Sequence, residues 1–277
     1  MAPVNQAAYG WVTPTLAYLF SFLGCLLGLK ATARARTLPA GAKRTRWLIL
    51  AAWAIGGTGI WVMHFVAMVG FQVTGAPDKF DPSITIASWI IAVIVVGLGL
   101  LVVGYNRPTP AKVIIAGFFM GVGVAAMHYT GMAAMTVDGT KSYDQRLVLA
   151  SVVIAVVAAT VALWFTVSVR KTGAVVVASL IMAVAVTGMH YTGMWALGVR
   201  LSGVHRQVSG WDPSLFLIPI FIFVLLVVVV LGYAMLNSLS DEDAEALNEL
   251  EARLAGGTAA MPVSPPSVGF TVHQRRR

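Results

Sequence analysis

The hexapeptide MHYTGM occupies residues 127–132 and recurs without change at residues 189–194. A weaker copy, MHFVAM, occupies residues 63–68. In chain order, His128 follows His64 by 64 residues, and His190 follows His128 by 62. A repeat of nearly constant period is typical of a chain built from repeated structural units.

The chain around these copies is strongly apolar. Of its 277 residues, 58% are hydrophobic and 11% are charged, whereas a soluble domain carries roughly a quarter charged residues. This composition is typical of an integral membrane protein and excludes a cytosolic enzyme or a disulfide-stapled secreted fold. Seven stretches can cross a bilayer of about 30 Å as helices of about 20 residues. They are residues 14–29, 47–71, 84–104, 113–136, 147–169, 174–199 and 214–236.

One period of the repeat holds two of these stretches, so the three copies fall in the even-numbered spans and point the same way. Continuous apolar runs exclude a membrane barrel, whose strands alternate in polarity. We therefore predict an all-α, polytopic membrane domain of seven transmembrane helices in residues 1–236, built around three two-helix repeats. Counted with the histidine itself, eight to ten residues separate each histidine from the limit of its span. That is about 12–15 Å at 1.5 Å per residue, in the outer half of the membrane.

The connections between the spans predict the orientation. The odd-numbered connections hold ten Lys and Arg and no acid, and most of this charge lies in residues 30–46. The even-numbered connections hold five basic and five acidic residues. The positive-inside rule then places the N-terminus outside and the C-terminus in the cytoplasm. The net charge of +8 belongs to this topology, so we expect no nucleic-acid partner.

The last residues, 237–277, differ in kind from the spans. Their sequence predicts a cytoplasmic tail with a short acidic helix over about 240–255, followed by disorder. That helix either stays solvated or pairs with a second copy in a homo-oligomer. No output domain fits in these 41 residues, and the spans hold no nucleophile–base pair or carboxylate dyad. We therefore expect the chain not to be an enzyme.

Each copy places a histidine and a methionine four residues apart, which stacks them on one helical face. Small residues seven before and three after each histidine lie on the same face and let neighbouring helices approach. They are Gly57, Ala67, Gly121, Gly131, Ala183 and Gly193. Three helices could thus bring three imidazoles and three thioethers to one centre.

Such ligands favour a metal. Imidazole suits zinc, copper, iron or nickel, and thioethers without carboxylates shift the preference toward copper(I). The candidate ligands are His64, His128 and His190 with Met68, Met132 and Met194. The methionines that precede the histidines, Met63, Met127 and Met189, point elsewhere and need a neighbouring helix to take part. Tyr129 and Tyr191 are expected to pack or to hydrogen-bond behind the ligands. The alternative is a packed core without metal.

At these residues the chain resembles bacterial MHYT-domain proteins, a family named for this tetrapeptide in alternate transmembrane helices. The resemblance covers about residues 11–236; the first copy departs from the motif at Phe65 and Val66. It implies a multi-pass sensor in the bacterial cytoplasmic membrane that binds copper and perceives oxygen, carbon monoxide or nitric oxide. It also implies signal transduction to a cytoplasmic partner, because many members continue into cyclic-di-GMP domains or kinases.

Two other hypotheses remain open. A copper-handling or transport protein would need ligands along the whole depth, and the inner halves of the even spans offer little beyond Met120 and Met182. A haem protein could use two histidines at one depth as axial ligands.

Overall fold

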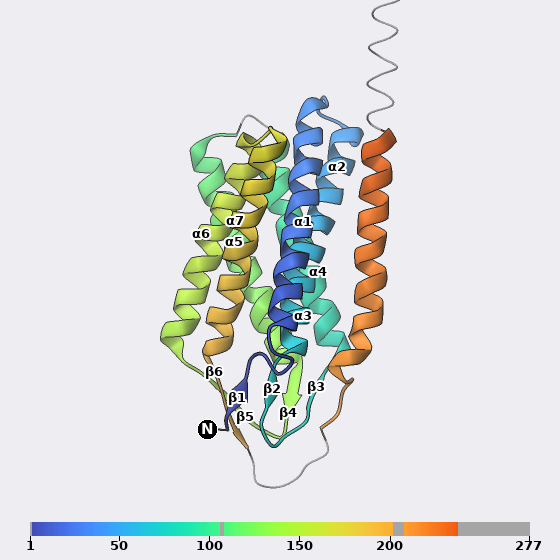
Figure 1. The fold of residues 1–277 in the computed structure, drawn as a ribbon. Helices are drawn as coiled ribbons and strands as arrows, with labels where there is room; N and C mark the ends of the chain where they lie inside the picture. The colour runs from blue at the N-terminus through green and yellow to red at the C-terminus, as the bar shows by residue number, and fades with distance from the viewer. Residues whose placement is uncertain (1, 106–107, 202–207, 238–277) are drawn as a thin grey trace, which may run out of the picture. The chain divides into compact units, whose positions relative to one another are not determined.

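The computed structural model describes residues 2–105, 108–201 and 208–237. Within them, seven helical segments are long and apolar enough to cross a membrane (Figure 1). The spans are α1 (Val12–Thr37), a composite of α2 (Ala42–Ala52), η1 (Trp53–Val62) and α3 (Met63–Val69), then α4 (Pro82–Tyr105), α5 (Pro110–Ala134), α6 (Gln145–Ser168), α7 (Thr172–Trp195) and the last span, Pro213–Asn237, whose first turn is η2 (Pro213–Phe216). The predicted all-α fold with seven spans is confirmed.

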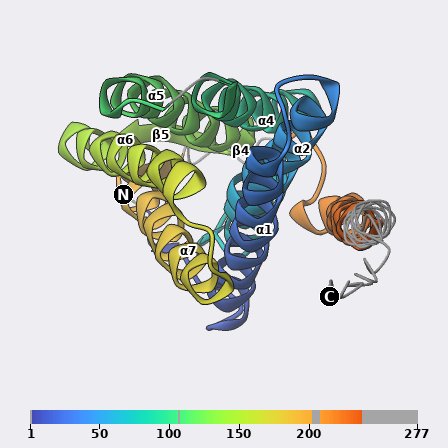
Figure 2. The same cartoon turned by 90° about the horizontal axis from the view of Figure 1, so that it is seen from above.

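Six of the spans form a closed ring (Figure 2). Helix α4 packs against α5, α5 against α6, α6 against α7, α7 against α1, and α1 against α2 and η1, which contact α4. Helix α4 lies between the composite span and α5, and α6 lies between α5 and α7, so each of them separates two histidine-bearing spans. In the third repeat that place is taken by α1 instead of the last span.

Glycines explain why α1 can occupy this place. A Cβ on Gly24 would lie 2.3 Å from the backbone nitrogen of Gly59, and a Cβ on Gly28 would lie 2.2 Å from the Ile55 side chain. Gly24 and Gly28 form a GxxxG pattern, which permits close helix packing in membranes. The pattern is visible in the sequence, although the repeat alone does not indicate its partner.

The composite span is the most buried of the seven, and its middle part, η1, is a π-helix. Its i→i+5 hydrogen bonds make each turn wider than an α-helical turn. Seven residues therefore do not make two turns, and the expectation that Gly57 shares a face with His64 is wrong. A Cβ on Gly57 would instead meet Phe223 of the last span at 2.6 Å.

Short antiparallel strand pairs gather at the end of the bundle that holds the N-terminus (Figure 1). β1 (Val4–Asn5) pairs with β2 (Gln72–Val73), β3 (Asp78–Phe80) with β4 (Met135–Val137), and β5 (Gly139–Tyr143) with β6 (Leu197–Leu201). The sequence pattern does not predict these strands, because each has at most five residues and its partner comes from a distant connection. They join the connections that follow the three histidine-bearing spans.

Several predicted limits are corrected. The stretch 30–46 is no long connection, because α1 and α2 continue through its arginines and lysines and leave only residues 38–41. Arg and Lys are good helix formers, so a helix can continue beyond the apolar stretch. Hydropathy therefore indicates the membrane span but not the residue at which the helix ends. The histidine-bearing helices end five or six residues beyond each histidine, about 8–9 Å at 1.5 Å per residue. Asn237, the first residue of the predicted tail, still belongs to the last span. The rest of that tail, including its helix over 240–255, lies outside the described residues.

Candidate metal centre

The imidazoles of His64, His128 and His190 converge at one point inside the bundle, as the register of the repeats predicts. Each comes from a different histidine-bearing span, α3, α5 or α7, and all three are buried. Nδ1 of His64 lies 3.0 Å from Nδ1 of His190 and 3.1 Å from Nδ1 of His128. The nearest ligand atoms of the three rings lie within 4.8 Å of one another. This spacing suits a single metal ion.

The rings stand nearly perpendicular to one another. Their planes meet at 73° to 88°, with centroids 4.9 to 5.2 Å apart. Two of them lie over glycines of the following copy. A Cβ on Gly131 would lie 2.3 Å from Nε2 of His64, and a Cβ on Gly193 would lie 2.3 Å from Nε2 of His128. These small residues thus make room for imidazoles, in addition to the close helix packing that the sequence predicts.

Within the described residues, the three rings cannot all satisfy their hydrogen-bonding nitrogens. A neutral imidazole nitrogen carries either one proton or one lone pair, yet Nδ1 of His64 faces two neighbours. The Nε2 atoms of all three rings are buried and have no partner there. A buried polar group without a partner costs about 1–3 kcal/mol. A cation between the Nδ1 atoms would accept one lone pair from each ring.

The six methionines of the three copies are all buried. They are Met63, Met68, Met127, Met132, Met189 and Met194. Met189 lines a small apolar cavity of about 30 Å³ together with Met120 and Met182. Burial is equally consistent with packing and with ligation, so their role as ligands stays a prediction.

The two tyrosines contact the histidines through their rings. Tyr129 meets His128, and Tyr191 meets His190, edge to face at 4.9 and 5.0 Å between centroids. The Tyr129 hydroxyl shares a hydrogen bond of 2.6 Å with Ser151 Oγ. Of the two expectations for Tyr129, packing against the ring fits this geometry. Ser151 was missed, although it is one of few polar residues in its span.

The first copy carries Phe65 where the others carry tyrosine. Phe65 is buried and packs against Trp61, Phe80 and Phe216, with ring centroids 4.9 to 5.6 Å apart. A hydroxyl would enter this aromatic cluster, where a polar group is costly without a partner. The departure from the repeated motif therefore has a packing reason.

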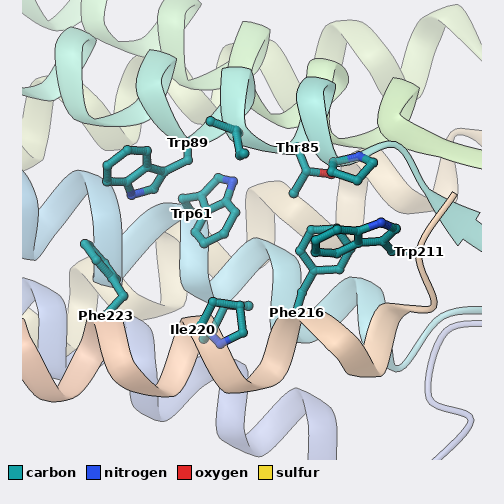
Figure 3. A pocket seen from close by; sticks show the side chains of 10 residues that line it. Trp61, Thr85, Trp89, Trp211, Phe216, Ile220 and Phe223 are labelled. Atoms are coloured by element: carbon teal, nitrogen blue, oxygen red, sulfur yellow. The ribbon is translucent and has the colours of Figure 1, made fainter.

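Next to this cluster lies a larger apolar pocket of about 260 Å³. Figure 3 shows Trp61, Trp89 and Phe223 toward one side and Phe216 and Trp211 toward the other. Its lining includes none of the three histidines. The pocket therefore belongs to the surroundings of the first repeat and not to the metal centre.

Lys141 holds the end of one histidine-bearing helix, a role that its place in a connection between two spans does not indicate. Its Nζ, on β5, donates to the carbonyl oxygens of Met132 at 3.0 Å and Met135 at 2.7 Å, with Ala133 at 3.4 Å. Carbonyls at a helix end lack intrahelical partners, and a cation there also matches the helix dipole. Burial lowers the pKa of Lys141. The lysine thus fixes α5 just beyond His128.

Comparison with known proteins identifies the repeat independently. A family model described as a bacterial signalling protein N-terminal repeat, MHYT, matches residues 57–116, 121–179 and 184–244. Each match contains one of the three histidines six or seven residues after its start. No solved structure matches the chain.

Three curated relatives are signalling proteins. The bifunctional diguanylate cyclase/cyclic di-GMP phosphodiesterase MucR of Pseudomonas aeruginosa is 33% identical over 87% of this chain and 35% of its own length. The cyclic di-GMP phosphodiesterase NbdA of the same organism is 35% identical over 67% of this chain and 24% of its own length. The signalling protein YkoW of Bacillus subtilis is 30% identical over 66% of this chain and 24% of its own length. The chain thus spans about a quarter to a third of the length of these relatives.

Proposed function

Because the chain belongs to the MHYT family of bacterial membrane signalling proteins, we propose that it is a sensor whose three histidines bind a copper ion. The observation that carries this proposal is the convergence of three buried Nδ1 atoms, with two separations of 3.0 and 3.1 Å. Two imidazoles on a tetrahedral ion at about 2.0–2.1 Å have nitrogens roughly 3.3 Å apart. Small ring movements would seat the ion.

The donor set favours copper among the metals that imidazole binds. The three rings are surrounded by spans without Asp, Glu, Lys or Arg near their depth, and buried methionines flank every histidine. Neutral nitrogen and thioether donors suit copper(I), whereas carboxylates would favour harder cations. We assign Met68, Met132 and Met194 as the thioether candidates because of their helical spacing from the histidines.

A three-coordinate ion keeps a position for a small ligand, as in metal sites with an open position. The apolar cavity of about 30 Å³ has the size and polarity to hold a diatomic gas. None of the three histidines lines it, but Val124 and Val186 of its lining precede His128 and His190 by four residues, about one helical turn. We propose that oxygen, carbon monoxide, nitric oxide or a change in copper oxidation state shifts the three ligand-bearing helices. The cytoplasmic end of the bundle would then report the shift to an output domain or partner.

The geometry weighs against the haem hypothesis. Two axial imidazoles on opposite faces of a macrocycle have nitrogens roughly 4 Å apart, twice an iron–nitrogen bond of about 2 Å. The Nδ1 atoms of His64 and His190 are only 3.0 Å apart, so a porphyrin cannot lie between them. Copper transport lacks a comparable observation in its favour.

Metal analysis with a visible spectrum of the detergent-purified full chain tests the proposal. The wild type should hold stoichiometric copper without a Soret band. His128→Ala should lose the metal because imidazole is the stronger donor. His205→Ala, which removes a histidine outside the three copies, should keep it. A wild type that never retains copper after loading, or a His128→Ala protein that binds it equally well, would refute the copper centre.

The methionines divide into two sets that the same measurement separates. Met132→Leu conserves volume and apolarity, so its stability should change by less than about 1.5 kcal/mol. Its affinity for copper(I) should nevertheless fall, because it loses a soft donor. Met127→Leu, the matched change before the histidine, should affect copper less. The reverse order would assign ligation to the methionine that precedes each histidine.

A further inference from the structure

A second site lies at the end of the bundle opposite the strands, far along the spans from the histidines. A pocket of about 50 Å³ opens there between α1, α2, α4 and α6. Thr32, Arg36, Arg44, Leu48, Pro108 and Thr166 are among its lining residues. Its volume exceeds the roughly 10–15 Å³ that one water needs, and exposed Pro108 places it within reach of the surroundings.

The two arginines in this pocket have buried donors without a hydrogen-bond partner. These atoms are Nε and Nη1 of Arg36 and Nε of Arg44, and no described residue forms a hydrogen bond with them. Nη2 of Arg36 donates to the backbone carbonyl of Val169, which fixes one side of the guanidinium. The carbonyl supplies an acceptor but no negative charge, so the charge of Arg36 is left uncompensated.

The described residues around the pocket include no acid that could provide that charge. Residues 30–46, 104–112 and 168–173, which form this end of the first six spans, contain neither aspartate nor glutamate. Arg170 adds a repulsive interaction with Arg36. Cationic groups that are partly buried together normally have a counter-charge. No described residue at this end supplies that counter-charge, and an external anion would supply it.

We infer that this pocket binds a phosphate group, held between Arg36 and Arg44. The planar guanidinium donates paired N–H groups that match phosphate oxygens, and this pairing is strong when partly shielded from water. Basic pockets between transmembrane helices bind anionic lipid headgroups in the same manner. A phospholipid headgroup or a soluble phosphate could supply the group.

Native mass spectrometry of the full chain in detergent, titrated with phosphatidylglycerol or phosphatidylcholine, tests the inference. The wild type should retain phosphatidylglycerol at least about tenfold more tightly than the zwitterionic lipid. The double variant R36Q/R44Q should lose this preference. K43Q/R46Q removes the same charge from exposed positions of the same helical hairpin and should keep it to within about twofold.

A second arm distinguishes the source of the phosphate. Inorganic phosphate, compared with chloride at equal ionic strength, is added to the chain in phosphatidylcholine nanodiscs. A rise in Tm that requires Arg36 and Arg44 identifies a soluble ligand, whereas a response to phosphatidylglycerol alone identifies a lipid. Equal responses of both double variants, or no response of the wild type to either probe, would overturn the inference. If R36Q/R44Q does not fold, the single variant R44Q replaces it, because R44Q leaves the hydrogen bond from Arg36 to Val169 intact.

Discussion

Single glycines set the positions of the imidazoles. Gly131 and Gly193 lie three residues after the histidines of the second and third copies and face the rings of His64 and His128. Neither glycine has a positive φ, so their importance lies in the absent side chain. The rings of His64 and His128 are thus each positioned by a small residue of the next repeat, which couples the first copy to the second and the second to the third.

Gly131→Ala and Gly193→Ala should therefore weaken the metal centre. The new Cβ would lie 2.3 Å from an imidazole nitrogen, so the ring and its Nδ1 must move. Such overpacking usually costs about 1–3 kcal/mol, and we expect copper affinity to fall by about tenfold or more. Copper titration of the purified variants measures this change.

Gly188→Ala is the matched control. It lies on the same helix as Gly193, and a Cβ there meets no atom within 4 Å. Copper binding of this variant should equal that of the wild type. If Gly131→Ala and Gly188→Ala bind copper alike, the rings are not held by the glycines.

The ends of the helices and the paired strands make up the next level of organisation. The histidine-bearing helix α5 ends at Ala134, six residues after His128, and passes directly into β4. Lys141 then returns from β5 to the carbonyls of that helix end. The strands therefore anchor the helix ends close to the centre.

Lys141→Met should destabilise this end of α5. Hydrogen bonds to a charged donor contribute about 1.5–3 kcal/mol when well shielded, and Lys141 is only partly buried, so we expect about 1–2 kcal/mol. Thermal unfolding of the purified chain measures the loss. Lys112→Met, on an exposed lysine of the same helix, should leave Tm within about 1 °C. Equal effects of the two changes would contradict a capping role.

Asp78 of β3 gives these strands a pH dependence. Burial raises the pKa of its carboxyl group above the ordinary 3.8, and the charge of Asp212 raises it further. The folded state therefore binds this proton more tightly than the unfolded state does. Between pH 3.8 and the higher folded pKa, the free energy of unfolding decreases as pH rises. At neutral pH, Asp78 is thus destabilising.

Asp78→Asn should raise Tm at pH 7, by about 1–3 °C, because it removes a partly buried charge. The advantage should shrink as pH falls toward 3.8, where the wild-type carboxyl group becomes protonated. Thermal unfolding between pH 4 and pH 8 measures both curves. A constant difference over this range would show that Asp78 does not titrate as proposed.

For the whole molecule, the unequal ends of the bundle predict its orientation. Among the described residues, arginines and lysines without acids collect at the end that holds residues 38–41, and the N-terminus lies with the strands at the other end (Figure 1). By the positive-inside rule, a reporter fused after Gly41 or at the C-terminus should be cytoplasmic. A reporter fused after Gly75, between β2 and β3, should be outside. A cytoplasmic result after Gly75 would reverse the proposed orientation.

The sequence by itself determined the number of spans, the repeat and the identity of its histidines. Continuous apolar stretches must form helices in a bilayer, because every backbone group needs an internal partner. The spacing of 64 and 62 residues placed His64, His128 and His190 at one depth. These features depend on local composition and on period, and both can be read along a single chain.

Only the tertiary structure decided which helices meet and which atoms face one another. The ring is closed by α1 and not by the last span, because Gly24 lets α1 approach the backbone of Gly59. The π-helical turns of η1 moved Gly57 away from the face expected of it. Lys141 reached α5 through the pairing of β5 with the distant β6. The closure of the ring by α1 and the contact of Lys141 with α5 depend on segments far apart in sequence, and such contacts leave no periodic signal in either segment alone.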